Sequence, residues 1–175
     1  MNFEARLREQ YEELVVVFPG LQKFSKYGRG FSIKGSLDLV DPHNGKIWEV
    51  YQVQILIPPN FPRKTPTFIE TGGVIKRIDD NHIDKKGVCC LAPRVEELLI
   101  LGPNYTLVDY VNKLAIPFLA NQKLQEFGEN PWDIGEYSHF GKGILEYYKE
   151  KLGTDSTKVV MSCLRYLCGD MKTGR

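Results

Sequence analysis

The chain has 175 residues, of which 42% are hydrophobic and 26% charged, and its formal net charge is +1. This composition is typical of one globular domain that can bury a core, and the near-zero charge gives no reason to expect nucleic acid or an anionic membrane as a partner. No apolar run approaches the roughly 20 residues of a membrane-spanning helix, and the first residues do not form a signal peptide, so we expect a cytoplasmic protein.

The sequence begins with the pattern of an amphipathic helix. Over residues 2–18, apolar side chains recur at helical spacing. Asn2 is a suitable N-cap, and Pro19 and Gly20 stop the pattern.

Four stretches after this helix predict an antiparallel meander. Residues 21–27 and 66–70 favour short strands, whereas 31–39 and 47–57 alternate apolar with polar side chains, as longer half-buried strands do. The side chains expected on the buried face of the two long strands are Phe31, Ile33, Leu37, Leu39, Ile47, Tyr51, Val53, Ile55 and Ile57.

The second half of the sequence predicts a long irregular segment and then helices. Residues 71–103 have no convincing period, and so long an irregular stretch in a compact domain is usually functional. Helical spacing resumes over 107–118, where Pro117 should kink or shorten the helix. Two more helices are expected at 139–152 and 156–168. The order of elements predicts an α+β fold with helices on one face of the sheet.

Within the irregular segment, one loop holds a cysteine among residues that suit nucleophilic catalysis. Cys90 follows His82, Lys85 and Lys86, whose positive charge would lower the pKa of the thiol and favour the reactive thiolate. The alternative is that the cysteine only packs in the core, since free cysteine is among the most buried residue types. Its neighbour Cys89 should face the opposite way, because adjacent side chains alternate in an extended segment.

The other cysteines predict no further chemistry. Cys163 and Cys168 lie five residues apart on an expected helix and favour packing. No metal or cofactor site is predicted, and the spacings show no disulfide framework. A redox role for the adjacent pair Cys89 and Cys90 ranks last among the alternatives, because no Cys-x-x-Cys element is present.

The order of elements, together with three short motifs, resembles the ubiquitin-conjugating enzyme family over roughly residues 3–125. That family has an N-terminal helix, a four-stranded meander, a proline-rich turn, a loop ending in Gly-x-x-Cys-Leu, and a helix opened by a Trp-x-Pro-x-x-Thr-like segment. The residues that carry the match are Phe61, Pro62 and Pro66, then Gly87, Cys90 and Leu91, then Pro103, Thr106 and Leu107. The resemblance implies a ubiquitin-conjugating-enzyme-like domain over 1–152, followed by a C-terminal helix and basic tail over 153–175.

The resemblance also implies an activity. Cys90 would accept the C-terminal glycine of a partner protein as a thioester and pass it to an amine on a target protein. In the divergent bacterial branch, some members of which belong to antiphage operons of the CBASS type, the partner is a ubiquitin-like protein or a cGAS-like nucleotidyltransferase. An activating enzyme is a possible further partner. The alternative is an inactive binding module of the same fold.

Two histidines are candidate catalytic residues on this interpretation. The family's His-Pro-Asn tripeptide aligns with Asp80-Asn81-His82, so His82 replaces the asparagine and would donate a hydrogen bond or act as a base. The alternative is that His82 only anchors the loop. His139 lies in a Gly-Glu-x-x-His segment like those of the bacterial branch and is either a second base or a loop anchor.

Overall fold

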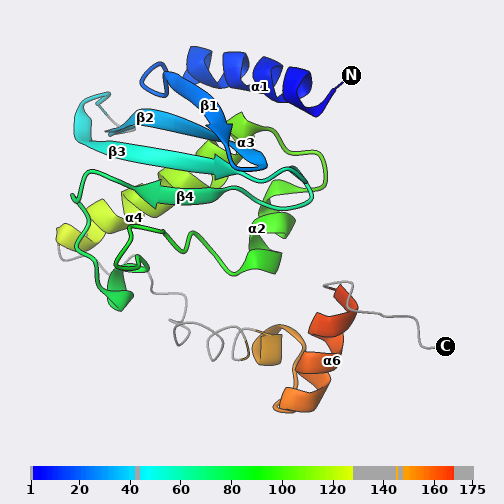
Figure 1. The fold of residues 1–175 in the computed structure, drawn as a ribbon. Coiled ribbons are helices and arrows are strands. Elements are labelled where there is room, and N and C mark those ends of the chain that lie inside the picture. Colours follow the sequence, from blue (N-terminus) through cyan, green and yellow to red (C-terminus); the bar gives the residue numbers. More distant parts are fainter. Residues whose placement is uncertain (1, 42–43, 128–144, 146–147, 168–175) are drawn as a thin grey trace. The chain divides into compact units, whose positions relative to one another are not determined.

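The computed structural model describes residues 2–41, 44–127, 145 and 148–167. The chain divides into two compact units, Met1–Pro131 and Trp132–Arg175, each described below by itself. The first unit contains an N-terminal helix, a four-stranded antiparallel sheet and further helices, which confirms the predicted α+β class (Figure 1).

The first helix, α1 (Phe3–Val17), begins and ends where the sequence predicts. The Asn2 side chain accepts a hydrogen bond of 3.1 Å from the backbone N–H of Glu4, and this contact satisfies one of the free donors of the first turn. Leu7 and Leu14 are buried. A row of aromatic rings, Phe3, Tyr11, Phe24 and Phe31, joins α1 to the first two strands through centroid distances of 4.8 to 6.1 Å.

The sheet is the predicted meander. Its strands are β1 (Lys23–Tyr27), β2 (Gly30–Val40), β3 (Ile47–Ile57) and β4 (Thr67–Glu70), and they pair in sequence order. Of the nine side chains expected on the buried face of the long strands, these eight are buried: Phe31, Ile33, Leu37, Leu39, Tyr51, Val53, Ile55 and Ile57.

The prediction for Ile47 is wrong, since its side chain is 56% exposed. The register shifts between Leu39 and Val40, so Leu39 pairs with Glu49 but Val40 pairs with Ile47. Paired residues in an antiparallel sheet point to the same face. The irregularity therefore places Ile47 beside the exposed Val40 and breaks the alternation that predicted its burial.

The helix α2 (Arg94–Leu101) lies inside the segment that the sequence left irregular. It is eight residues long, which is shorter than the window over which helical spacing can be recognised in a sequence. Leu101 is buried, whereas Leu98, Leu99 and Ile100 are exposed. Pro93 precedes it without a side-chain cap. A short 3₁₀ turn, Asp79–Asn81, is the other regular element of this segment.

The predicted helix over 107–118 forms as three consecutive pieces. A capping box between Thr106 and Asp109 opens α3 (Leu107–Tyr110), and a π-helical turn (Val111–Ala115) leads into α4 (Ile116–Glu126). The expected irregularity before Pro117 is therefore present: the π turn ends directly before α4, and Pro117 is the second residue of α4. In Figure 1, α3 and α4 lie behind the sheet and α1 lies along β1. The side chains at the predicted helical spacing, Leu107, Tyr110, Val111, Leu114 and Phe118, are all buried.

The second unit is described over 145 and 148–167. Residues 148–151 are helical, and α6 (Thr157–Leu167) matches the expected helix at 156–168. The Thr154 N–H donates to the Lys149 carbonyl at 2.9 Å, so the turn before α6 is joined to the helix that precedes it. The domain bounds 1–152 and 153–175 stay a prediction. His139 and Cys168 lie outside the described residues. No helix in the described ranges is long and apolar enough to cross a membrane.

Candidate active site around Cys90

The two adjacent thiols face different surroundings. Cys89 continues the sheet: its N–H donates to the Phe68 carbonyl at 2.9 Å, and it pairs with Ile83 in an isolated antiparallel bridge. Its side chain is 7% exposed, and its Sγ donates to the Gly87 carbonyl at 3.5 Å. Cys90 is exposed. The extended backbone therefore separates the pair into one core thiol and one thiol that solvent can reach.

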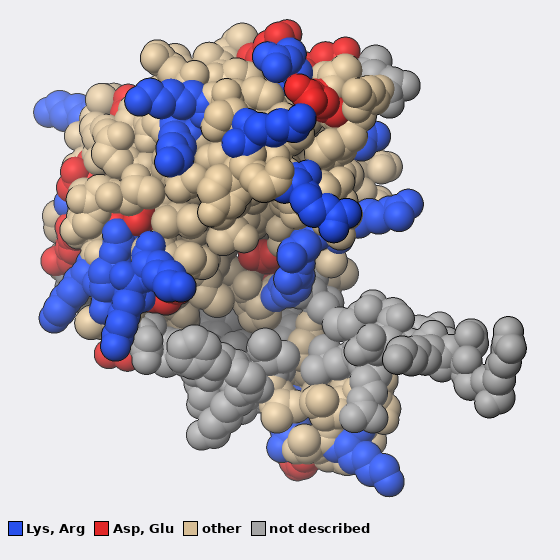
Figure 2. All heavy atoms as spheres, in the orientation of Figure 1, with Lys and Arg blue, Asp and Glu red and all other residues tan. Residues whose placement is uncertain are grey.

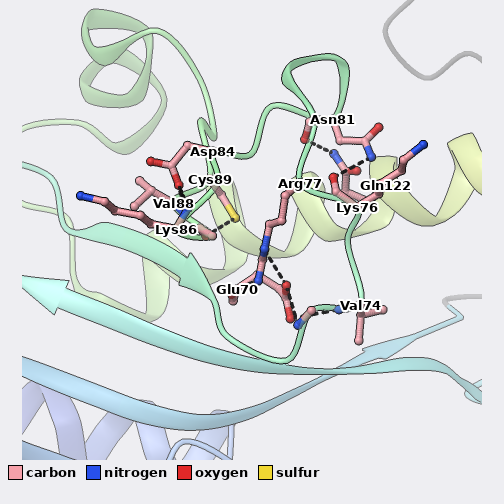
Figure 3. Close-up of polar contacts among 12 residues, drawn as sticks. Glu70, Val74, Lys76, Arg77, Asn81, Asp84, Lys86, Val88, Cys89 and Gln122 are labelled. Carbon is pink, nitrogen blue, oxygen red and sulfur yellow. Dashed lines mark hydrogen bonds and ion pairs between the residues drawn. The ribbon is translucent and has the colours of Figure 1, made fainter.

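The turn before the thiols is held by one aspartate and requires a glycine. The Asp84 carboxylate accepts hydrogen bonds of 2.8 Å from the N–H groups of Lys86 and Val88 (Figure 3). Gly87 has φ of +84°, and a Cβ at this position would lie 2.3 Å from the Glu70 carbonyl oxygen. Only glycine fits this conformation and this approach.

A buried ion pair joins the end of β4 to the segment that follows it. The Glu70 side chain is fully buried, and Arg77 contacts its carboxylate at 2.7 Å and donates to its carbonyl at 2.7 Å. The carboxylate also accepts from the N–H groups of Gly73 and Val74 at 3.1 and 3.4 Å. The Glu70 N–H donates to the Gly87 carbonyl at 2.9 Å. Figure 3 shows Arg77 reaching Glu70, so this pair ties the start of the thiol loop, residues 71–93, to the end of β4.

His82 is connected to Cys90 through the backbone. The Cys90 N–H donates to the His82 carbonyl at 2.8 Å, and His82 has a positive φ of 52°, which a non-glycine residue seldom adopts. The preceding residue is tied down on both sides: the Asn81 amide donates to the Lys76 carbonyl at 3.0 Å, and the buried Gln122 of α4 donates to the Asn81 carbonyl at 3.0 Å. His82 is thus held next to Cys90, and the role of its imidazole stays a prediction.

The pKa of the Cys90 thiol corrects one sequence prediction. We expected Lys85, Lys86 and His82 to lower it. Although solvent reaches the Cys90 side chain, the protein packed around it removes part of its hydration, and this desolvation, followed by the charge of Glu97, raises the pKa of Cys90 above its usual value. Lys85 and Lys86 are exposed, and water screens the charge of exposed ammonium groups. Burial raises the pKa of Cys89 further, to about 12. Neither thiol is therefore a preformed thiolate at neutral pH.

Glu97 is the charged group near Cys90 that sequence reasoning missed. It lies in the first turn of α2, and its carboxylate accepts a hydrogen bond of 2.6 Å from the hydroxyl of the buried Thr65. Burial raises the pKa of Glu97, while the Thr65 bond and Arg94 act in the opposite direction. Glu97 stands beside Arg94 and Glu96 in the sequence, where nothing marks it out, and its effect on the pKa of Cys90 is a property of the folded chain.

The described residues contain no group of three His, Cys, Asp or Glu side chains arranged to hold a metal ion. On the face that Figure 2 shows, Lys and Arg side chains form separate groups with Asp and Glu among them, and uncharged atoms cover the centre.

No family model matches the chain, and no curated protein or solved structure matches it either. The geometry around Cys90 is therefore the basis for a functional proposal.

Proposed function

We propose that this protein carries an acyl group as a thioester on Cys90 and transfers it to an amine, as the ubiquitin-conjugating enzymes that it resembles do. The single observation that carries the proposal is the division of the adjacent thiols, with Cys90 exposed and Cys89 in the core. This is the choice that the Gly-x-x-Cys-Leu motif implies. The arrangement of α1, the meander, the anchored loop and the following helices supports the same proposal.

The chemistry needs an accessible sulfur on a fixed backbone. Covalent catalysis divides a difficult acyl transfer into two easier steps, each of which passes through the cysteine. The backbone bond from Cys90 to His82 and the Glu70–Arg77 pair hold the loop, so the acyl group would be presented in a defined position. On this proposal the donor is the C-terminal glycine of a ubiquitin-like protein or a nucleotidyltransferase, in a bacterial antiphage system.

A chemically activated donor tests the proposal without an activating enzyme. The probe is a peptide ending in Gly-Gly, supplied as its 2-mercaptoethanesulfonate thioester. We expect one peptide adduct that reducing agent removes, detected by intact mass. Cys90→Ala should abolish the adduct and Cys89→Ala should retain it. An adduct that survives Cys90→Ala but not Cys89→Ala would reverse the assignment of the carrier.

An inactive binding module of the same fold is the second candidate, and the raised pKa of Cys90 favours it, because it reduces the thiolate fraction at neutral pH. The same experiment separates the two functions. A binding module would form no adduct that reducing agent removes, and its Cys90→Ala variant would bind its partner protein as the unchanged chain does.

A further inference from the structure

We propose that the exposed edge of β1 binds an extended, acidic segment of a partner protein. This surface lies at the opposite edge of the sheet from the thiol. The outer strand on one side is β1, whereas Val88 and Cys89, which directly precede Cys90, pair with β4 on the other side (Figure 1). The inference goes beyond the proposed function and does not depend on thioester chemistry.

The first support is an uncompensated positive charge. Residues 14–37, which contain the β1–β2 hairpin, include no Asp or Glu, and the facing part of β3, residues 51–57, adds none. The same hairpin carries four exposed cations, Lys23, Lys26, Arg29 and Lys34. In the part of the chain that the structure describes, none of these four takes part in an ion pair, and the Glu4 carboxylate of the neighbouring α1 contacts Arg8 instead. The hairpin therefore presents its charge to an outside partner.

The second support is the position of two of these lysines. The register of β1 and β2 pairs Lys23 directly with Lys34, so their side chains lie on one face with Cβ atoms about 5 Å apart. Like charges directly opposite each other destabilise a sheet. The next residue across the sheet is the neutral Gln54, whose amide donates to the Ser32 hydroxyl at 2.9 Å. A carboxylate bound beside Lys23 and Lys34 would relieve this repulsion.

The third support is the free edge of β1. Tyr27 pairs with Gly30 across a two-residue turn, and such a closing pair is hydrogen-bonded. Because hydrogen-bonded and non-hydrogen-bonded pairs alternate, the N–H and C=O groups of Phe24 and Lys26 point away from β2. The ring contact of α1 with β1 is made by Tyr11 on Phe24, which shares the core face with Ile33, and Lys26 and Tyr27 are exposed. An exposed edge of this kind is a template for an added peptide strand.

These features favour an acidic protein segment over other occupants. A second copy of the chain would bring the same lysines to this edge, and their charges would repel it. Nucleic-acid-binding domains are as a rule strongly basic, whereas the net charge of this chain is +1. A peptide of about five residues would match the length of β1, pair with its backbone, and place carboxylates at alternate positions on the face of Lys23 and Lys34.

The test uses the full chain and two short peptides. The probe is the capped peptide Glu-Val-Glu-Val-Glu, whose carboxylates share one face when it is extended, and Gln-Val-Gln-Val-Gln is its neutral analogue. We expect NMR spectra of the backbone amides, with peptide added to about 1 mM, to show saturable shifts centred on Phe24 and Lys26. The neutral peptide should bind about tenfold more weakly, because it forms no ion pair.

Charge variants locate the site. Lys23→Gln combined with Lys34→Gln should weaken binding of the acidic peptide by about tenfold, the effect of two exposed ion pairs. Lys85→Gln combined with Lys86→Gln removes the same charge from exposed positions of the thiol loop and should leave the affinity unchanged. If the first variant does not fold, the unchanged chain decides: raising NaCl from about 0.05 to 0.5 M should weaken binding, because salt screens exposed charges.

Any of the following results would overturn the inference. Absence of shifts in β1 at the highest peptide concentration would mean that the lysines only protect a free edge from association. Equal affinities of the two peptides, equal effects of the two double variants, or binding that salt does not weaken would exclude recognition by charge. A deoxythymidine oligonucleotide of the same charge that binds β1 as strongly as the acidic peptide would make this surface a nucleic-acid site instead.

Discussion

The β2–β3 hairpin and the thiol loop between β4 and α2 are stabilised in different ways. The hairpin has a ladder of backbone pairs that keeps one register from Phe31 to Leu39 and a buried apolar face, so the same alternation repeats along this part of the two strands. The loop has short isolated bridges and depends on a few buried polar contacts around Glu70, Asp84 and Gly87. The comparison indicates that the thiol loop depends on a few specific polar contacts, whereas the hairpin depends on a repeated pattern of backbone pairs and buried apolar side chains.

Removal of Arg77 should have the largest effect on folding. Arg77→Leu would leave the fully buried Glu70 carboxylate without its ionic partner, and breaking a buried pair costs about 3–5 kcal/mol. We expect a loss of this size in the free energy of unfolding, measured by urea denaturation. The exposed Arg63→Leu is the matched control and should change stability by less than about 0.5 kcal/mol. Equal losses for the two variants would contradict the role of the ion pair.

A pair of isoleucines on β3 tests the sheet and its irregularity together. Ile55 is 0% exposed and Ile47 is 56% exposed. Ile55→Ala should cost about 2–5 kcal/mol, because a buried side chain leaves a cavity. Ile47→Ala should cost less than about 0.5 kcal/mol. Comparable costs in thermal or urea unfolding would mean that the register shift does not turn Ile47 outward.

Gly87→Ala should have a smaller effect, concentrated in the loop. The added Cβ meets the Glu70 carbonyl oxygen, and the residue must keep a positive φ, which costs on the order of 1–3 kcal/mol. Because the strain lies at the loop, hydrogen exchange should accelerate at the amides of Val88 and Cys89 more than in β2 or β3. Gly45→Ala, which has a positive φ but nothing near its Cβ, is the control for strain without a clash.

The two thiols should differ in reactivity without any change in stability. In a Cys163→Ser, Cys168→Ser background, iodoacetamide should modify Cys90 in the native state and leave Cys89 unmodified until the protein unfolds. Because the pKa of Cys90 is raised above its reference value of 9.0, its thiolate fraction is small at neutral pH, and the alkylation rate should still rise above pH 9. A rate that reaches its plateau below pH 8 would contradict the assigned direction of the shift.

Several elements of this protein follow from local sequence, because one short-range rule decides each of them. The capped helix at residues 3–17, the meander and the buried faces of β2 and β3 come from helical spacing and strict alternation. The opposite orientation of Cys89 and Cys90 follows from the alternation of side chains in an extended segment.

The rest was decided by contacts between residues distant in sequence. Ile47 turns outward at a register shift between β2 and β3, and α2 is too short for helical spacing alone to reveal it. The basic residues near Cys90 in sequence do not lower its pKa. Burial raises it first, and then the charge of Glu97, which Thr65 holds from 32 residues away. Electrostatics act through space and depend on burial, so the environment of the thiol is a property of the folded chain and not of its neighbours in sequence.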